Sequence, residues 1–529
     1  MSHAGQSTKQ GSETVCDQQR VIDFLRTPSN YDPEPADVIQ IDTHAAIIFL
    51  AGEYAYKIKR AIQLPYLDFR SLEERHRVCL RELEINQPNA PRIYLDVMPV
   101  TGLANGGLSL GGAGQPVEWV LRMRRFSQQE ILDDLANRGA LELDVITQLA
   151  EILVQFHARA PVDLDQDAEV GLRDVIETTT DAFRRRKPFL GTSDVDTYRD
   201  AISTEFRARQ GDLKQRASEG CIRRCHGDLH LRNIVLLDGR PTLFDAIEFD
   251  EKIATVDILY DLAFLIMDLW HRGLKRHANA LLNRYIYRSP DGHVLDGLRL
   301  LPLFLSLRGA VRSMVALDAL PHIKEIEQPA KQDEAVEYFH RARSFLEPNK
   351  PHLLAVGGLS GTGKSTLAAA LAPGIGTAPG AYIVRSDVER KLLFDTLPET
   401  QLGGEAYTEV TTARVYDQVY RKAERALSAG HAVIADAVFS KPCQREAIAN
   451  IARELDVPFV GLWLEAQNNI LLTRVAQRVD DASDANVQVV KKQLSYDVGP
   501  INWITIDASG SQDAVAARVR QMLPEAFSS

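Results

Sequence analysis

Three oxygen-bearing side chains, Asp228, Asn233 and Asp245, stand close together in one short stretch of the sequence. Asp228 and Asn233 fall in a polar loop that begins at His226, and Asp245 follows an apolar segment. Phosphoryl transfer from a nucleotide requires one carboxylate beside the acceptor hydroxyl and two oxygen ligands for Mg²⁺. The pattern predicts that Asp228 is the catalytic carboxylate and that Asn233 and Asp245 bind the metal ion.

A short hairpin is the element that must position these side chains. The apolar run from Ile234 to Leu237 predicts a buried strand, and the dipeptide Asp238-Gly239 predicts a tight turn. Pro241 to Phe244 would return the chain as a second strand. Such a hairpin would hold the three side chains near a common point. The alternative is a polar hairpin in which Asp and Asn only form turns.

The order of His226, Asp228, Asn233 and a later Asp resembles a known catalytic loop, H-x-D-x-x-x-x-N. This loop belongs to the aminoglycoside phosphotransferase-like branch of the protein-kinase-like fold. The resemblance implies an α+β protein-kinase-like N-terminal domain that uses ATP and Mg²⁺. Asp257 and Asp261, which follow at helical spacing, resemble the acidic pair that braces this loop in the family.

The same resemblance implies a strand lysine for the α and β phosphates and a helix glutamate that holds it. Lys57 in the stretch A-Y-K and Glu82 on the following helix are expected in these roles, with Lys59 and Glu84 as the alternatives. The glycine-rich loop of kinases is missing, because Thr43 to Ala45 occupy the turn where it would lie.

A second phosphate site is predicted in the last third of the chain. The segment G-L-S-G-T-G-K-S fits G-x-x-x-x-G-K-S, with an apolar strand before it and an Ala-rich helix after it. Backbone N–H groups of such a loop and the positive end of the helix bind phosphate. Lys364 would reach the β and γ phosphates, and Ser365 would bind Mg²⁺. The predicted nucleotide-binding residues are Gly358, Ser360, Gly361, Thr362, Gly363, Lys364, Ser365 and Thr366.

The parts that follow resemble small P-loop kinases such as gluconate kinase, adenylylsulfate kinase, the zeta-toxin group and the kinase domain of polynucleotide kinase. The resemblance implies an α/β P-loop domain with a parallel sheet, in which Asp387 binds or deprotonates the acceptor hydroxyl. It also implies that Arg474 and Arg478 on a lid neutralise the transferring phosphate. Asp436, at the end of a strand, is the candidate metal ligand or base. For each arginine the alternative is a surface charge on an amphipathic helix.

At 529 residues the chain is expected to hold more than one domain. We predict a disordered N-terminus over 1–18, a kinase-like domain over 19–346, a linker over 347–352 and a P-loop kinase domain over 353–529.

The formal charge of −11 gives no general attraction to nucleic acid. Five scattered cysteines argue against a disulfide framework. Since no apolar run is seen to approach a membrane span and the N-terminus has no signal-peptide core, a cytoplasmic protein without a membrane is expected.

The leading hypothesis is a bifunctional ATP-dependent phosphotransferase in which both domains transfer the γ-phosphate to a hydroxyl of a small molecule. A sugar, an amino alcohol or an aminoglycoside-like compound would serve as acceptor. One alternative is a C-terminal kinase for nucleic-acid 5′-hydroxyls, although no basic, aromatic groove is evident. Another is a nucleotide-sensing regulatory protein with one inactive site, which the missing glycine loop would support. No oligomeric state is predicted.

Overall fold

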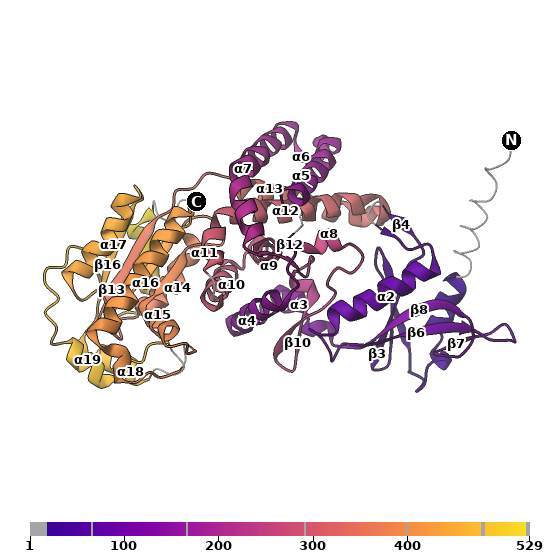
Figure 1. Cartoon of the computed structure of the whole chain (residues 1–529), viewed down its shortest axis with the longest axis horizontal. Coiled ribbons are helices and arrows are strands. Elements are labelled where there is room, and N and C mark those ends of the chain that lie inside the picture. The colour runs from indigo at the N-terminus through magenta and orange to yellow at the C-terminus, as the bar shows by residue number, and fades with distance from the viewer. Residues whose placement is uncertain are drawn as a thin grey trace. The chain divides into compact units, whose positions relative to one another are not determined.

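The computed structural model describes residues 18–64, 67–164, 168–289, 292–397, 400–477 and 482–524. The chain forms two compact units (Figure 1). The first comprises Met1–Gln148, Gln155–Gln166 and Gly220–Asp261, and the second comprises Leu149–Val154, Asp167–Glu219 and Leu262–Ser529. These units are built from interleaved segments, so they do not correspond to the continuous domains predicted from the sequence. The predicted domain boundaries stay predictions.

A six-stranded antiparallel sheet begins the first unit, in the strand order β1-β2-β3-β8-β6-β7. Helix α2 lies against β6 and β8 of this sheet (Figure 1). A helix over residues 18–26 precedes the sheet. The elements are β1 (Val38–Asp42), β2 (Ala46–Ala51), β3 (Tyr54–Lys59), β4 (Gln63–Leu64), β5 (Leu67–Asp68), α2 (Leu72–Asn86), β6 (Tyr94–Gly102), β7 (Leu108–Leu110) and β8 (Pro116–Arg124).

Strand β3 carries two different faces, because successive side chains of a strand point to opposite sides of a sheet. Tyr56 and Ile58 pack in one apolar cluster, together with residues of β1, β2, β6 and β8. Ala55 packs on the opposite side, in a cluster that also contains Val235 of β10. The period of two therefore places Lys57 on the face of the sheet that meets the predicted catalytic hairpin.

The predicted hairpin is present and is formed by β10 (Ile234–Leu237) and β11 (Arg240–Leu243). The strands are antiparallel, with Ile234 opposite Leu243. Asp238 and Gly239 form the turn with φ of +49° and +78°, which matches the right-handed twist of the strands. The first unit also contains α3 (Leu132–Asn137), β9 (Ile222–Arg224), α8 (Glu251–Ala254), β12 (Thr255–Asp257) and parts of α4 (Leu143–Arg159) and α9 (Ile258–His271).

Helices form the first part of the second unit. Beyond the remaining segments of α4 and α9, these are α5 (Ala168–Arg185), α6 (Lys187–Leu190), α7 (Thr192–Ser218), α10 (Lys275–Arg288), α11 (His293–Gly297), α12 (Leu301–Ala319) and α13 (Gln328–Ser344). Among the described residues one helical stretch, His293–His322, is long and apolar enough to cross a membrane. The sequence expectation was that no apolar run approaches the length of a membrane span. Within the structure 72% of the most apolar window of His293–His322 is buried, as in a core helix.

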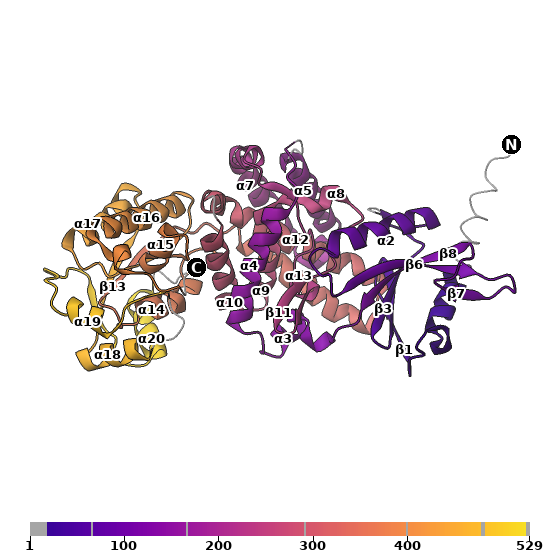
Figure 2. The ribbon, with the colours of Figure 1, turned by 60° about the horizontal axis from the view of Figure 1, so that its bottom comes forward.

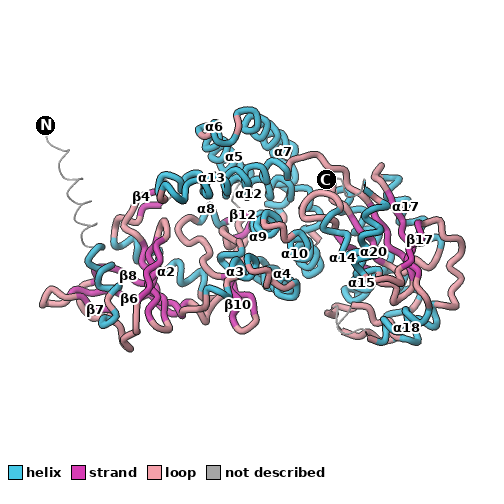
Figure 3. Tube along the Cα trace, turned by 180° about the vertical axis from the view of Figure 1, so that it is seen from behind, coloured by secondary structure: helices cyan, strands magenta, loops and turns pink. Residues whose placement is uncertain are grey.

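A five-stranded parallel sheet forms the rest of the second unit, in the order β14-β15-β13-β16-β17. Helices α14 and α20 pack together over one face of it, in a core that includes Val356, Leu367 and Val519 (Figure 2). Figure 3 shows how strands and helices alternate here. The elements are β13 (Leu353–Gly358), α14 (Lys364–Leu371), β14 (Tyr382–Arg385), α15 (Ser386–Leu393), α16 (Glu409–Ser428), β15 (Val433–Asp436), α17 (Pro442–Glu454), β16 (Phe459–Glu465), α18 (Asn468–Ala476), α19 (Val487–Gln493), β17 (Ile504–Asp507) and α20 (Gln512–Met522).

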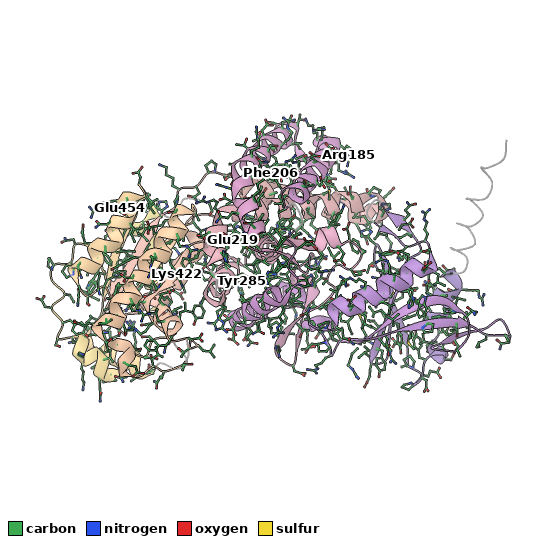
Figure 4. All side chains as sticks on the ribbon, in the orientation of Figure 1. Arg185, Phe206, Glu219, Tyr285, Lys422 and Glu454 are labelled. Atoms are coloured by element: carbon green, nitrogen blue, oxygen red, sulfur yellow. The ribbon has the colours of Figure 1, made fainter. Side chains whose placement is uncertain are left out.

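The outer edge of this sheet is paired with side chains of α10. Asn283 accepts a hydrogen bond from the backbone N–H of Ile383 at 2.7 Å, and both Asn279 and Asn283 donate to the carbonyl of Ala381. Tyr285 of the same helix is buried and is labelled in Figure 4. Because an edge strand leaves backbone groups unpaired, these amides supply partners for the N–H of Ile383 in β14 and for the carbonyl just before that strand. Strand β14 leads directly into Asp387.

Candidate active sites

Lys57 is the centre of the first candidate site. Its Nζ lies 2.7 Å from Glu82 Oε1 and 2.7 Å from Asp245 Oδ1. The lysine is 8% exposed and Glu82 is fully buried, so their ion pair is shielded from water. Glu84, the alternative to Glu82, is exposed and pairs with Arg81 instead. The structure thus brings together the predicted lysine, helix glutamate and metal ligand.

The backbone around Asp245 explains how its carboxylate reaches Lys57. Asp245 adopts a left-handed conformation with φ of +60°, which is unusual for a residue other than glycine. Its N–H donates to the hydroxyl of Tyr94 at 2.9 Å, and the N–H of Ala246 donates to Asn86 Oδ1 at 2.9 Å. Local strain of this kind persists where surrounding contacts over-determine the backbone, often at functional sites.

The charges of this cluster shift its pKa values. Removal from water acts to lower the pKa of Lys57, but the carboxylates of Asp245 and Glu82 outweigh it and raise that pKa well above its ordinary value. Burial acts to raise the pKa of Asp245, whereas the neighbouring Lys57 lowers it below its ordinary value. Both groups are therefore charged at neutral pH.

Asp228 and Asn233 lie together in the adjoining loop. Asn233 Nδ2 donates to the backbone oxygen and to Oδ2 of Asp228, both at 2.9 Å, which leaves the amide oxygen directed elsewhere. His230 Nε2 lies 3.3 Å from Asp228 Oδ2. Asp228 is also close enough to Asp245 for its charge to act on the pKa of that carboxyl. The three predicted oxygen groups therefore share one site.

Asp261 braces the backbone of this loop. Its carboxylate is fully buried and accepts the N–H groups of His226 at 3.2 Å and Gly227 at 2.8 Å. His157 Nε2 contacts the same carboxylate at 3.2 Å. Asp257 accepts the N–H of Leu259 at the start of α9. The structural roles expected for these two acids agree with the observed contacts.

A cavity of about 950 Å³ lies beside the sheet of the first unit. Its walls include Ile39 and Ile41 of β1, Leu50 of β2 and residues 124–129, which run from the end of β8 into the segment after it. Leu50 and Phe126 also pack against the cluster that contains Ala55, on the face that carries Lys57. The cavity thus combines apolar strand side chains with an irregular backbone segment, an arrangement that can receive a flat aromatic base.

The phosphate loop joins β13 to α14 in the second unit. Gly358 and Gly361 have φ of +137° and +87°, conformations that L side chains rarely adopt. A Cβ at Gly361 would meet the backbone oxygen of Leu471 at 2.8 Å. Only glycine therefore fits both the backbone turn and the close approach of α18.

Ser365, in the first turn of α14, meets Asp436 at the carboxyl end of β15. The Ser365 hydroxyl donates to Asp436 Oδ2 at 2.6 Å, and Arg385 Nε lies 3.3 Å from the same oxygen. Burial raises the pKa of Asp436, while Arg385 and Lys364 act in the opposite direction. Lys364 Nζ itself donates to the backbone oxygen of Leu359 at 3.1 Å, across the loop.

The remaining loop residues have defined positions. Thr362 donates to the carbonyl of Leu359 at 2.8 Å, and the N–H of Ser360 donates to Gln493 Oε1 at 2.8 Å. Gly363 is the N-cap of α14, and Thr366 lies exposed in the first turn of that helix. These contacts hold the backbone of the loop in a defined conformation.

Asp387 lies in the first turn of α15, and its charge acts on the pKa values of Tyr407 and Asp436, so the two predicted acids are neighbours. Arg474 donates a hydrogen bond to the carbonyl of Gly510 at 3.1 Å, and its role on a lid stays a prediction. Arg478 lies outside the described residues.

Sequence reasoning did not single out two residues at these sites, Arg385 and Gln493. Arg385 directly precedes Ser386-Asp387, so its place at a strand end was a usable signal. Gln493 reaches its site only through tertiary folding, and no motif marks it. The sequence predicts that Glu248, three residues after Asp245, helps to place the metal ion or the acceptor, and in the structure this carboxylate pairs with Lys59. The ion pair between Glu248 and Lys59 is considered further below.

Two protein-family models match separate ranges of this chain. The family model described as "Phosphotransferase enzyme family" matches residues 70–298, and the one described as "AAA domain" matches residues 353–497. Among solved structures, the GDP complex of an aminoglycoside 2′-phosphotransferase-IIIa mutant is 13% identical, with a TM-score of 0.38 over 61% of this chain and 97% of that chain. A gluconokinase from Sinorhizobium meliloti 1021 is 16% identical, with a TM-score of 0.24 over 34% of this chain and 98% of that chain.

Two mycobacterial relatives match almost throughout. Proteins of Mycobacterium tuberculosis and Mycobacterium bovis, both named as uncharacterized, are 30% identical to this chain over 485 residues, which are 89% of this chain and 92% of each relative. The matched domain families imply phosphoryl transfer of the kinase type. The chain belongs to the family of these mycobacterial proteins, and it joins a phosphotransferase-family domain of the protein-kinase-like fold to a C-terminal P-loop kinase-like domain.

Proposed function

We propose that the protein is a bifunctional ATP-dependent kinase, in which each domain transfers the γ-phosphate of ATP to a hydroxyl of a small molecule. The observation that carries this proposal is the cluster of Lys57, Glu82 and Asp245 beside Asp228 and Asn233. A second, independent set of groups, the phosphate loop with Ser365 and Asp436, supports the second activity. Sugars, amino alcohols and aminoglycoside-like compounds are the proposed acceptor class.

The donor set of the first site fits Mg²⁺. Asp245 offers a carboxylate and Asn233 an amide oxygen, and hard oxygen ligands are what Mg²⁺ prefers. The ammonium group of Lys57 already neutralises Asp245 at 2.7 Å, so a cation is accommodated at this oxygen. When bound, Mg²⁺ would neutralise charge on the phosphates. Lys57 would bind the α and β phosphates, and the cavity beside β1 and β2 would hold the base.

Asp228 would accept the proton of the acceptor hydroxyl. Its side chain is 39% exposed, and one oxygen is oriented by Asn233 Nδ2. The acceptor oxygen forms a bond to the γ-phosphorus, the bond from that phosphorus to the bridging oxygen of ADP breaks, and the hydroxyl proton passes to Asp228. The protein contributes position and charge, which are the main sources of catalysis in phosphoryl transfer.

In the second site, Ser365 and Asp436 would hold Mg²⁺ and the loop amides would bind the phosphates. Asp387, close to Asp436, would face the acceptor hydroxyl. The two sites have separate acids, and nothing in their chemistry requires a shared acceptor.

The test is transfer of radiolabelled γ-phosphate by the full-length chain to a panel of sugars, amino alcohols and aminoglycosides. Asp228→Ala should abolish transfer to one acceptor and Lys364→Ala transfer to another, because each substitution disables one site. Glu84→Gln, on the exposed side of α2, is the matched control and should leave both rates unchanged. If neither Asp228→Ala nor Lys364→Ala altered any transfer, the proposal would be refuted.

A further inference from the structure

A buried row of alternating charges extends beyond the ion pair of Lys57 and Glu82. Lys59 lies two residues further along β3 and therefore on the same face of the sheet. Its Nζ is 2.5 Å from Glu82 Oε2, so each oxygen of this glutamate binds a different lysine. Lys59 also binds Glu248 Oε1 at 2.5 Å, just as Lys57 binds Asp245.

Burial makes this row an interdependent unit. Lys59 is 2% exposed, Glu248 is 8% exposed and Glu82 is fully buried. Removing one partner of a buried ion pair leaves an uncompensated charge, which is strongly unfavourable, whereas removing both partners is much better tolerated. Lys59 and Glu248 must therefore keep each other charged, and they hold β3, α2 and the segment after Asp245 together.

Lys57 cannot provide this support during the proposed reaction. In the structure Lys57 forms ion pairs with Asp245 and Glu82. Its proposed role, however, is to bind phosphates while Asp245 binds Mg²⁺. Lys59 has no such second task. Lys59 can keep its ion pair with Glu82 when Lys57 binds the phosphates of the nucleotide.

We propose that Lys59 and Glu248 are positioning residues that hold Glu82 and the metal-binding segment in place for nucleotide binding. This inference rests on the proposed function of the first site. The backbone N–H groups of Asp245, Ala246 and Ile247 are each bound, by Tyr94, Asn86 and His226 respectively. Glu248 adds a second side-chain link between this segment and β3, beside that of Asp245 with Lys57.

The rival assignment is that Glu248 is itself a metal ligand. In the structure its Oε1 is engaged by Lys59 at 2.5 Å. The two assignments differ in what the removal of Lys59 should do. A metal ligand would act without Lys59, whereas a positioning pair fails when either member is lost.

The experiment uses the full-length chain with Lys364→Ala, so that nucleotide binding reports on the first site alone. Binding of Mg-AMPPNP is measured by isothermal titration calorimetry for Lys59→Met, Lys59→Arg, Glu248→Gln and the double variant Lys59→Met/Glu248→Gln, each with its Mg²⁺ dependence. We expect Lys59→Met to weaken binding by about tenfold or more, as is common when a group that orients a ligand is lost. Lys59→Arg should restore most of the affinity, because it returns the charge.

Glu248→Gln should resemble Lys59→Met, and the double variant should bind no more weakly than the worse single variant, because the residues act as one unit. The double variant also removes the buried pair as a whole, so it should fold even if a single variant does not. Unchanged affinity in the Lys59→Met and double variants would overturn the inference. So would a raised Mg²⁺ requirement in Glu248→Gln that Lys59→Met does not share.

Lys57→Met separates this inference from the proposed function. If it abolishes binding while Lys59→Met has no effect, only the positioning role is wrong. If Lys57→Met also leaves Mg-AMPPNP binding unchanged, the proposed nucleotide site itself is wrong.

Discussion

Replacing Asp261 by asparagine should loosen the catalytic loop without changing the volume of the side chain. The carboxylate accepts the backbone N–H groups of His226 and Gly227 at 3.2 and 2.8 Å and is fully buried. Asparagine keeps one oxygen, which can serve one N–H, but it presents an NH₂ group to the other. The variant therefore leaves one buried donor without an acceptor.

The expected cost follows from these contacts. A buried N–H without an acceptor costs about 1–3 kcal/mol, and loss of the charge on the remaining hydrogen bond adds roughly 1 kcal/mol. A total of roughly 2–4 kcal/mol corresponds to about a 30- to 1,000-fold rise in the population of the opened loop. Asp228, two residues after His226, would lose its fixed position together with the loop.

Hydrogen exchange followed by mass spectrometry measures this opening directly, on peptides that cover residues 220–236. Asp261→Asn should speed exchange there by the factor above. Asp257→Asn is the matched control, because Asp257 accepts the N–H of Leu259 at a helix start, where asparagine is also a good cap. Unchanged protection in Asp261→Asn, or an equal loss in Asp257→Asn, would refute the reasoning.

Three further predictions concern the second unit. Gly361→Ala should remove the phosphate transfer that remains in an Asp228→Ala chain. The new Cβ would lie 2.8 Å from a backbone carbonyl oxygen of α18, and the φ of +87° at this position is unfavourable for alanine. Retained transfer would contradict the close approach. Asn283→Ala should lower the melting temperature by a few degrees, since the N–H of Ile383 loses its acceptor at a cost of about 1–2 kcal/mol, and an unchanged melting temperature would contradict this pairing. Burial lowers the pKa of His431 from 6.5 to about 4. As the pH drops from about 6.5 to 4, this imidazole is protonated in the unfolded chain but stays neutral in the folded chain, so the free energy of unfolding should fall over that range. His431→Gln should flatten this part of the profile of melting temperature against pH, and an unchanged profile would show that other groups cause the loss.

The local sequence determined the parts of both sites that lie close together along the chain. Asp228, Asn233 and the turn at Asp238-Gly239 stand at fixed spacing, and a tight hairpin needs only local turn chemistry to form. The phosphate loop is equally local, because glycine conformations and the start of α14 shape it. The alternating pattern of β3 placed Lys57 and Lys59 on the same face of the sheet. The pattern alone therefore could not decide which of the two lysines binds the phosphates.

Only the tertiary structure decided which groups meet across long separations. Glu82 binds both lysines of β3, and Glu248 meets Lys59 across 189 positions of sequence, because α2 and the segment after Asp245 pack against the same strand. Gln493 reaches Ser360 across 133 positions in the same way. Such contacts depend on packing and on the burial of charge, which leave no periodic or spaced signal in a single sequence.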